Sequence, residues 1–252
     1  MNFKKYVTIV TVVIAVSATM LATAYGAPKP ELKKDWNISF LGTMQVPDQL
    51  EIVDGKDVIE EVMKFSEKAS KAYPLKPTAP KVKAPSFEDI SEFFTTNNIG
   101  VYQLALKNNG SYNTAILFAG KIPAKYNING LIFFDKLKNT DSQKQKELHT
   151  LLLKGIDEAY TKVPDLQNLS QLEIIEFYPF ERIINQNVEM IGMGGSVAVR
   201  SFKLIQPAAF KIYVINKNAE IYVLGVINSG PDRKMWDDMA KDMLSNMQWN
   251  VL

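Results

Sequence analysis

The sequence predicts an α+β domain in which helices pack against an antiparallel sheet. Hairpin signals outnumber β-α-β units along the chain, and two long amphipathic segments predict helices. Hydrophobic residues make up 46% of the 252 residues and charged residues 22%, which is typical of a folded globular chain. This composition excludes a disordered chain, a collagen-like chain and a polytopic membrane protein.

The first 26 residues have the organisation of a secretory signal peptide. Lys4 and Lys5 precede an uncharged stretch that runs from Tyr6 to Pro28, with small residues at the exit of its apolar part. We therefore expect export to the periplasm or to the outside of a bacterial cell. An uncleaved leader would instead anchor the protein, since the stretch is long enough to span a bilayer. A lipoprotein is excluded, because lipid attachment needs a cysteine and the chain has none.

The charge balance outside this leader is neutral. The whole chain has 29 basic and 27 acidic residues, and the two leader lysines account for the difference. Binding to nucleic acid depends on clustered Lys and Arg that neutralise phosphates, so we expect no nucleic-acid partner. The absence of cysteine also excludes disulfides, thiolate zinc sites and thiol catalysis.

After the leader, residues 27–252 are expected to form a single domain. Short strands are predicted over residues 36–42 and 49–53, with a turn at Val46-Pro47-Asp48 between them. Apolar spacing predicts a helix over residues 57–72.

A Pro/Lys-rich linker is predicted at about residues 73–85. Its four prolines prevent regular structure and favour an extended chain. The linker is either a solvated connection or a docking arm for an anionic surface or partner. The docking candidates are its lysines Lys76, Lys81 and Lys83.

The middle of the chain contains a hairpin, a strand and a long helix. Asn109-Gly110 between two apolar runs predicts the hairpin, because both residues tolerate positive φ. A short strand is predicted over residues 131–134. The amphipathic segment 142–162 predicts a helix, with Asp141 as its N-cap and Pro164 beyond its end.

The last third of the chain is predicted to be a strand meander followed by a closing helix. Turn residues separate the apolar runs of this region, and its last segment has apolar residues at helical spacing. The predicted elements are strands over 172–180, 196–205, 210–215 and 220–226, turns at Gln206-Pro207 and at 216–218, and a helix over 231–247 with Ser229 as its cap.

The order of these elements resembles the PsbP-like fold. The resemblance covers residues 35–54 and 98–247, from the Pro turn at Val46-Pro47 to the closing helix introduced by Ser229-Gly-Pro. The family is an α-β-α sandwich of extrinsic photosystem subunits and exported bacterial proteins. The resemblance implies an assembly or binding role and supplies no catalytic residues.

Few residues fit known catalytic patterns. His149 is the only histidine, so a His-based triad would depend on it and a multi-His zinc site is excluded. His149 flanks the apolar stripe of its predicted helix, which favours a boundary residue. Residues 192–196 are glycine-rich, but they precede a strand and lack the Gly-Lys-Ser/Thr of a phosphate loop. They are interpreted as a connection or bulge between strands that could line a ligand site. No catalytic residue and no cofactor are therefore assigned.

The closing helix carries methionines at a spacing of four residues: Met235, Met239, Met243 and Met247. Thioethers are soft ligands for Cu(I), which makes the first three of them candidate metal ligands. The same residues form the apolar stripe that the helix needs for docking, and we favour core packing. The copper interpretation requires methionine side chains exposed to a cavity.

Candidate residues for a small-molecule site lie on the strands and the closing helix. Alternation places Arg200 on the face of Ala198, where it needs a buried carboxylate partner or a cleft that holds an anion. The candidate ligand-binding residues are Gly192, Gly194, Gly195, Arg200 and Trp236.

Three functional hypotheses follow from the sequence. The first is an exported, non-enzymatic envelope protein that binds a partner protein or the membrane surface. The second is a carrier of a small ligand or a soft metal. The third is an enzyme without a recognisable motif, which would show a cleft with clustered carboxylates.

Overall fold

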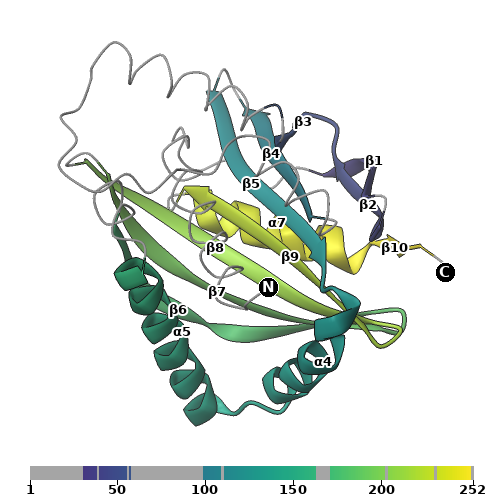
Figure 1. Cartoon of the computed structure of the whole chain (residues 1–252). Helices are drawn as coiled ribbons and strands as arrows, with labels where there is room; N and C mark the ends of the chain where they lie inside the picture. The colour runs from purple at the N-terminus through teal and green to yellow at the C-terminus, as the bar shows by residue number, and fades with distance from the viewer. Residues whose placement is uncertain are drawn as a thin grey trace.

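A seven-stranded antiparallel sheet forms the centre of the structure, a computed structural model (Figure 1). The structure describes residues 31–38, 40–55, 57, 99–108, 111–162, 171–201, 204–229 and 232–250. The strands lie in the order β3-β4-β5-β9-β8-β7-β6. They span Leu50–Asp54 (β3), Ile99–Asn108 (β4), Ser111–Lys121 (β5), Gln171–Asn185 (β6), Val188–Ser201 (β7), Leu204–Lys217 (β8) and Glu220–Ser229 (β9).

A second, three-stranded sheet joins distant parts of the chain. It contains β1 (Leu32–Ile38), β2 (Gly42–Pro47) and β10 (Gln248–Trp249), in the order β1-β2-β10. Gln248 of β10 lies opposite Thr43 of β2. The last described strand therefore completes a sheet that the first two described strands begin.

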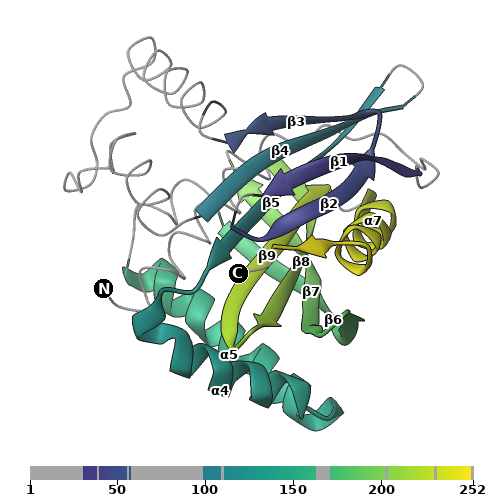
Figure 2. The same ribbon diagram turned by 90° about the vertical axis from the view of Figure 1, so that its right-hand side faces the viewer.

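Helices cover both faces of the large sheet. α7 (Arg233–Ser245) and the small sheet lie on one side, and α4 (Ala124–Lys138) and α5 (Ser142–Lys162) lie on the other (Figure 2). Alternation along β8 produces two cores, because Tyr213 points toward α7 and Val214 toward α4. The predicted α+β class, with an α-β-α layering, is confirmed.

Local signals explain the best-predicted elements. β4 and β5 pair up to Asn108 and Ser111, which leaves two residues for the predicted Asn109-Gly110 turn. α5 has the predicted bounds, and the backbone N–H of Lys144 donates to Asp141 Oδ1 at 2.9 Å. The carboxylate thus satisfies one of the N–H groups that a helix start leaves open.

Three boundary predictions are wrong. Residues 131–134 belong to helix α4 and not to a strand. Four apolar residues in a row suit either a strand or a buried helix turn, so the sequence alone did not distinguish the two. Gln206-Pro207 lies inside β8. Pro207 sits one residue beyond the last β8–β9 pair, where a missing N–H costs little. Ser229 is the last residue of β9, and Asp232 takes the N-cap position of α7.

Two further predictions need a smaller shift. The strand predicted over 36–42 combines the end of β1, a turn and the start of β2, with Gly42 at a φ of 153°. Residues 192–196 are the middle of β7 rather than a connection between strands. The bulges lie opposite them in β6, where the register shifts between Ile174 and Glu176 and between Tyr178 and Glu181.

Several predicted segments lie outside the described residues. They are the leader 1–26, nearly all of the helix 57–72 and the linker 73–85 with Lys76, Lys81 and Lys83. Among the residues that the structure describes, no helix is both long enough and apolar enough to cross a membrane.

Candidate functional site

The methionines of α7, and Met247 just beyond its end, are buried in the larger core. Met235 is 7% exposed, and Met239, Met243 and Met247 are each 1% exposed. They pack with residues of both sheets in one apolar cluster. The copper interpretation required exposed methionine side chains, and this condition is not met. Within the described ranges, no group of three or more His, Asp or Glu side chains is placed to hold a metal ion.

Trp236 also belongs to this core. It is 1% exposed, and its indole Nε1 has no hydrogen-bond partner among the described residues. Trp236 packs with the methionines of its own helix rather than facing open space. Its position makes it a packing residue of α7.

The glycines of β7 allow the backbone and side chains of the neighbouring strands to approach closely. A Cβ at Gly192 would lie 2.8 Å from the Tyr213 ring, and one at Gly194 would lie 2.5 Å from the backbone oxygen of Phe210. A Cβ at Gly195 would lie 2.4 Å from the backbone oxygen of Glu176. All three glycines are buried. The protein itself fills the space that a ligand would have needed.

An ionic cluster lies between the sheet and α7. Glu181 of β6 pairs with Lys211 of β8 at 3.0 Å and with Lys241 of α7 at 2.5 Å. The side chain of Lys211 is only 7% exposed, so it needs this partner. Glu181 thereby connects two strands to the closing helix. Its separation from both lysines along the sequence explains why sequence reasoning missed it.

Burial sets the protonation of this cluster. The pKa of Asp237 on α7 is raised to about 6 by burial, against the attraction of Lys211 and Arg233. Burial also works to raise the pKa of Glu181, but hydrogen bonds from Lys241 and Lys211 outweigh it, and the pKa is lowered. The pKa of Tyr213 is raised by burial. The cluster holds charge beside α7, with Lys211 buried and Lys241 half exposed.

The N-terminal turn of α7 is held by an aromatic contact. The guanidinium of Arg233 lies 3.9 Å from the centroid of the Tyr178 ring, and its Nε lies 3.7 Å from Asp237. The Tyr178 hydroxyl shares a hydrogen bond with the hydroxyl of Ser196 on β7. Together with the ion pairs of Glu181, these contacts hold α7 against the sheet.

His149 is a packing residue of α5. Its ring stacks on Phe177 of β6 with centroids 3.9 Å apart and planes at 8°, and it meets Phe180 edge to face. Burial lowers the pKa of His149. This agrees with a boundary residue. The backbone of Arg200 pairs with Gln171 and Ile205, and its side chain lies outside what the structure describes.

Helix α4, which the sequence did not predict, is fastened to the sheet. Its Phe134 and Leu137 are buried against β7, β8 and β9. Gly130 faces Ile221, where a Cβ would come within 3.1 Å. At its C-terminal end, Lys138 pairs with Glu189 at 2.7 Å.

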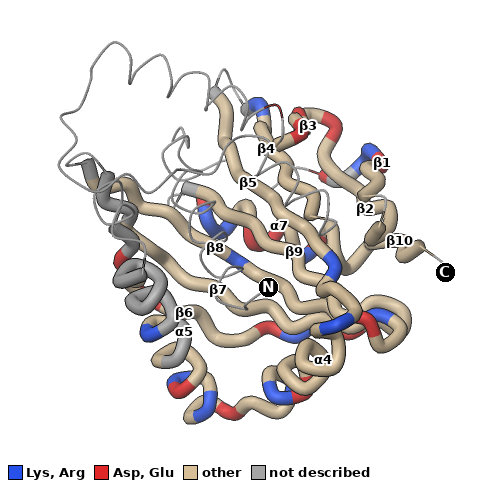
Figure 3. The backbone as a smooth tube through the Cα atoms, in the orientation of Figure 1, with Lys and Arg blue, Asp and Glu red and all other residues tan. Residues whose placement is uncertain are grey.

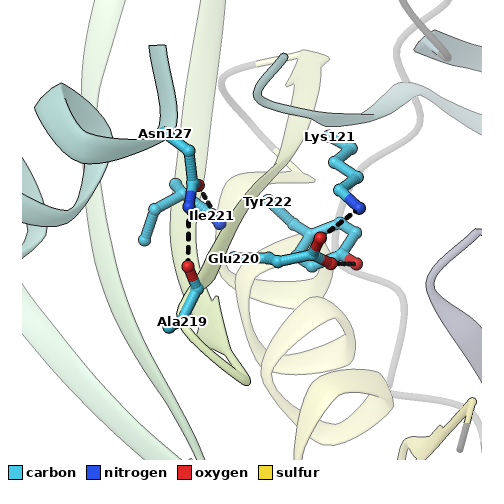
Figure 4. A network of polar contacts seen from close by, with 6 residues as sticks. All are labelled: Lys121, Asn127, Ala219, Glu220, Ile221 and Tyr222. Atoms are coloured by element: carbon cyan, nitrogen blue, oxygen red, sulfur yellow. Dashed lines mark hydrogen bonds and ion pairs between the residues drawn. The ribbon is translucent and has the colours of Figure 1, made fainter. Parts of the chain in front are cut away.

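The N-terminal half of α4 is fastened to the turn between β8 and β9 (Figure 4). Asn127 donates from Nδ2 to the backbone oxygen of Ala219 at 2.7 Å and accepts from the backbone N–H of Ile221 at 3.0 Å. Ala219 has a φ of 59°, an unfavourable conformation for alanine that this contact helps to hold.

A charged network braces the other side of the same turn (Figure 4). Glu220 accepts from Lys121 at 2.6 Å and from the Tyr222 hydroxyl at 2.8 Å. Lys217 is buried, its Nζ lies 5.9 Å from the Tyr222 ring centroid, and burial lowers its pKa. The turn that supports α4 is therefore held from both faces of the sheet.

The outer side of α4 is unusually apolar for an exposed helix. Ile128 is 74% exposed, Ile132 is 51% exposed and Phe133 is 41% exposed. Lys125 and Lys136 are exposed on the same helix, and Figure 3 marks the basic residues along α4 and α5. We call these five residues the docking face: Lys125, Ile128, Ile132, Phe133 and Lys136. Leu131, Phe134 and Leu137 are spaced three residues apart, which is typical of the inward-facing side of a helix. This spacing was the sequence signal from which α4, and therefore its exposed side, could have been predicted.

Comparisons with known proteins bear on the fold. No protein-family model and no curated protein sequence matches the chain. Cyanobacterial PsbP from Synechocystis sp. PCC 6803 is similar in structure, with 9% identity and a TM-score of 0.40, over 91% of this chain and 99% of that one. The PsbP-like resemblance expected from the element order is thus found as a resemblance of fold.

Two further solved structures are similar. The Saccharomyces cerevisiae Ran-binding protein Mog1p has 8% identity and a TM-score of 0.36, over 86% of this chain and 96% of its own. A Pseudomonas aeruginosa protein of unknown function has 6% identity and a TM-score of 0.34, over 87% of this chain and 98% of its own. These similarities concern the arrangement of helices and strands.

Proposed function

We propose that the protein is an exported, non-enzymatic accessory module that docks onto a component of the cell envelope through the docking face of α4. One observation carries the proposal. A helix that is fastened to the sheet at both ends nevertheless keeps Ile128, Ile132 and Phe133 exposed to solvent. Apolar side chains gathered on an ordered surface are typical of an interaction site.

Three other features support this proposal. The leader predicts export, which would bring the domain to the envelope. The buried Lys211 and the half-buried Glu181 take part in the ion pairs that hold α7 in place. The buried methionines and the filled glycine run offer little support for a carrier.

Site-specific photocrosslinking in intact cells tests the proposal. A photoreactive amino acid replaces Ile132 on the docking face or, as a control, Ile175 on the edge strand β6, which is 64% exposed. We expect position 132 to form one reproducible adduct with an envelope component and position 175 to form none. Equal adducts at the two positions, or none at position 132, would contradict the proposal.

Substitution supplies a second test. The double variant Ile128→Ser/Ile132→Ser should lose the envelope component during a gentle pull-down. The matched variant Ile175→Ser should retain it. Both changes affect exposed isoleucines, so we expect both variants to stay folded.

A further inference from the structure

We infer that the docking face binds the surface of an anionic phospholipid bilayer. This inference rests on the proposed function and names the partner of the same face. Its basis is the combination of exposed aliphatic and aromatic side chains with lysines on one fastened helix.

The spacing of the face places both kinds of residue together. Lys125, Ile128, Ile132 and Lys136 follow one another at intervals of three or four residues, so they share one side of α4. All four are exposed. Phe133 is exposed beside them. The result is an apolar strip with a positive charge near each end.

Lysine distinguishes a bilayer from a protein partner. Lysine is depleted in the cores of protein–protein interfaces, whereas aliphatic residues with lysines are typical of helices that lie on membranes. A lysine stem covers apolar surface while its ammonium group reaches the headgroups. Lys125 and Lys136 are placed to do this on either side of Ile132.

The charges near the face favour an anionic surface. Lys125 and Lys136 belong to no ion pair that the structure describes, whereas Lys138 is paired with Glu189. Asp135 is the one acidic residue of α4, and it is exposed. Lys125 Nζ lies 5.1 Å from the Tyr126 ring centroid, and the two lysines against one carboxylate leave a net positive helix surface.

The packing of α4 limits how deeply it can enter a bilayer. Phe134 and Leu137 are committed to the sheet, and Asn127 holds the helix to the β8–β9 turn. Only the outer side chains can be inserted, so α4 lies in the plane of the surface at the level of the headgroups. The association is therefore reversible and sensitive to salt.

The absence of cysteine makes a direct test possible in the full chain. Ile132→Cys and the control Ile175→Cys each carry a single environment-sensitive fluorophore. The proteins are mixed with phosphatidylcholine vesicles, with or without phosphatidylglycerol, and with brominated acyl chains as quenchers. We expect a blue shift and quenching at position 132 with phosphatidylglycerol only, reversed by high salt. The leader is common to both proteins, so it cannot produce a difference between the positions.

The lysines should contribute measurably. Lys125→Gln and Lys136→Gln should each weaken binding to phosphatidylglycerol vesicles by about fivefold. Lys234→Gln on α7, an exposed lysine away from the face, should leave binding unchanged.

The outcomes separate this inference from the proposed function. Absence of quenching at position 132, or equal quenching at positions 132 and 175, overturns the lipid inference. If position 132 still crosslinks to an envelope protein in cells, the docking function stands and its partner is a protein. If neither signal appears at position 132, both proposals fail.

Discussion

Helices α7 and α4 lie on opposite faces of the same sheet and use their apolar residues differently. α7 buries all six of its apolar residues: Met235, Trp236, Met239, Ala240, Met243 and Leu244. α4 buries Phe134 and Leu137 and leaves three large apolar residues in solvent. The contrast indicates that α7 contributes more buried apolar surface to the stability of the domain than α4 does, and the exposed apolar residues of α4 form the face on which the proposed docking function rests.

The largest effect should come from the centre of α7. Trp236→Ala removes a fully buried indole, and we expect a loss of roughly 3–5 kcal/mol in the free energy of unfolding. Urea denaturation followed by circular dichroism measures this. A loss below about 1 kcal/mol would contradict the assignment of α7 as the stabilising helix.

Glycine substitutions compare the two faces directly. Gly194→Ala places a Cβ against the backbone oxygen of Phe210, so we expect a loss of roughly 1–3 kcal/mol. Gly130→Ala on α4 meets only the side chain of Ile221, and alanine favours a helix by about 1 kcal/mol. Thermal unfolding should therefore show a much smaller change for Gly130→Ala. Equal losses would remove the distinction between the two glycines.

The ionic cluster beneath α7 should make the free energy of unfolding depend on pH. The pKa of Asp237 is about 6 in the folded protein, above its ordinary value of 3.8, so the folded state binds its proton more tightly. The contribution of Asp237 therefore becomes less favourable as pH rises from about 4 to about 6.

Asp237→Asn removes this penalty. We expect the variant to be more stable than the wild type at pH 7, by on the order of 2 kcal/mol, and similar to it near pH 3. Urea titrations at several pH values test this. A variant that is less stable at pH 7 would show that the pairing of Asp237 with Arg233 outweighs the cost of its burial.

The fastening of α4 should contribute less. Asn127→Ala leaves the backbone N–H of Ile221 without its partner, and we expect a loss of about 1 kcal/mol. Hydrogen exchange should show faster exchange in the β8–β9 turn and α4 but not in α7. Asn129→Ala, an exposed position on the same helix, serves as a control.

The smallest effect on stability should come from the docking face. Ile132→Ser should change the free energy of unfolding by no more than about 0.5 kcal/mol, because the side chain is half exposed. The same urea experiment measures it. A loss comparable to that of Trp236→Ala would show that Ile132 is a core residue and would weaken the contrast between α4 and α7.

Local signals in the sequence were sufficient for much of the fold. Asp141 and an amphipathic stripe predicted α5, and Asn109-Gly110 predicted the β4–β5 hairpin, because each depends on neighbouring residues. The apolar run 131–134 was ambiguous. Which of its side chains face inward depends on the position of the sheet, so α4 and its docking face were missed.

The ionic cluster could not be predicted for a different reason. Glu181, Lys211 and Lys241 come from three separate elements and meet only when the strand register is correct. Bulges in β6 alter that register, and one of them lies just before Glu181. Periodicity alone cannot locate such a shift.

The pairing of β10 with β2 has a consequence for how the chain reaches its native state. Trp249 lies opposite Gly42, so more than two hundred residues of chain separate the partners. Sequential hairpins such as β6 to β9 can form while synthesis continues, but the small sheet cannot close before residue 249 leaves the ribosome. Completion of the fold is therefore a late event in the formation of the native structure.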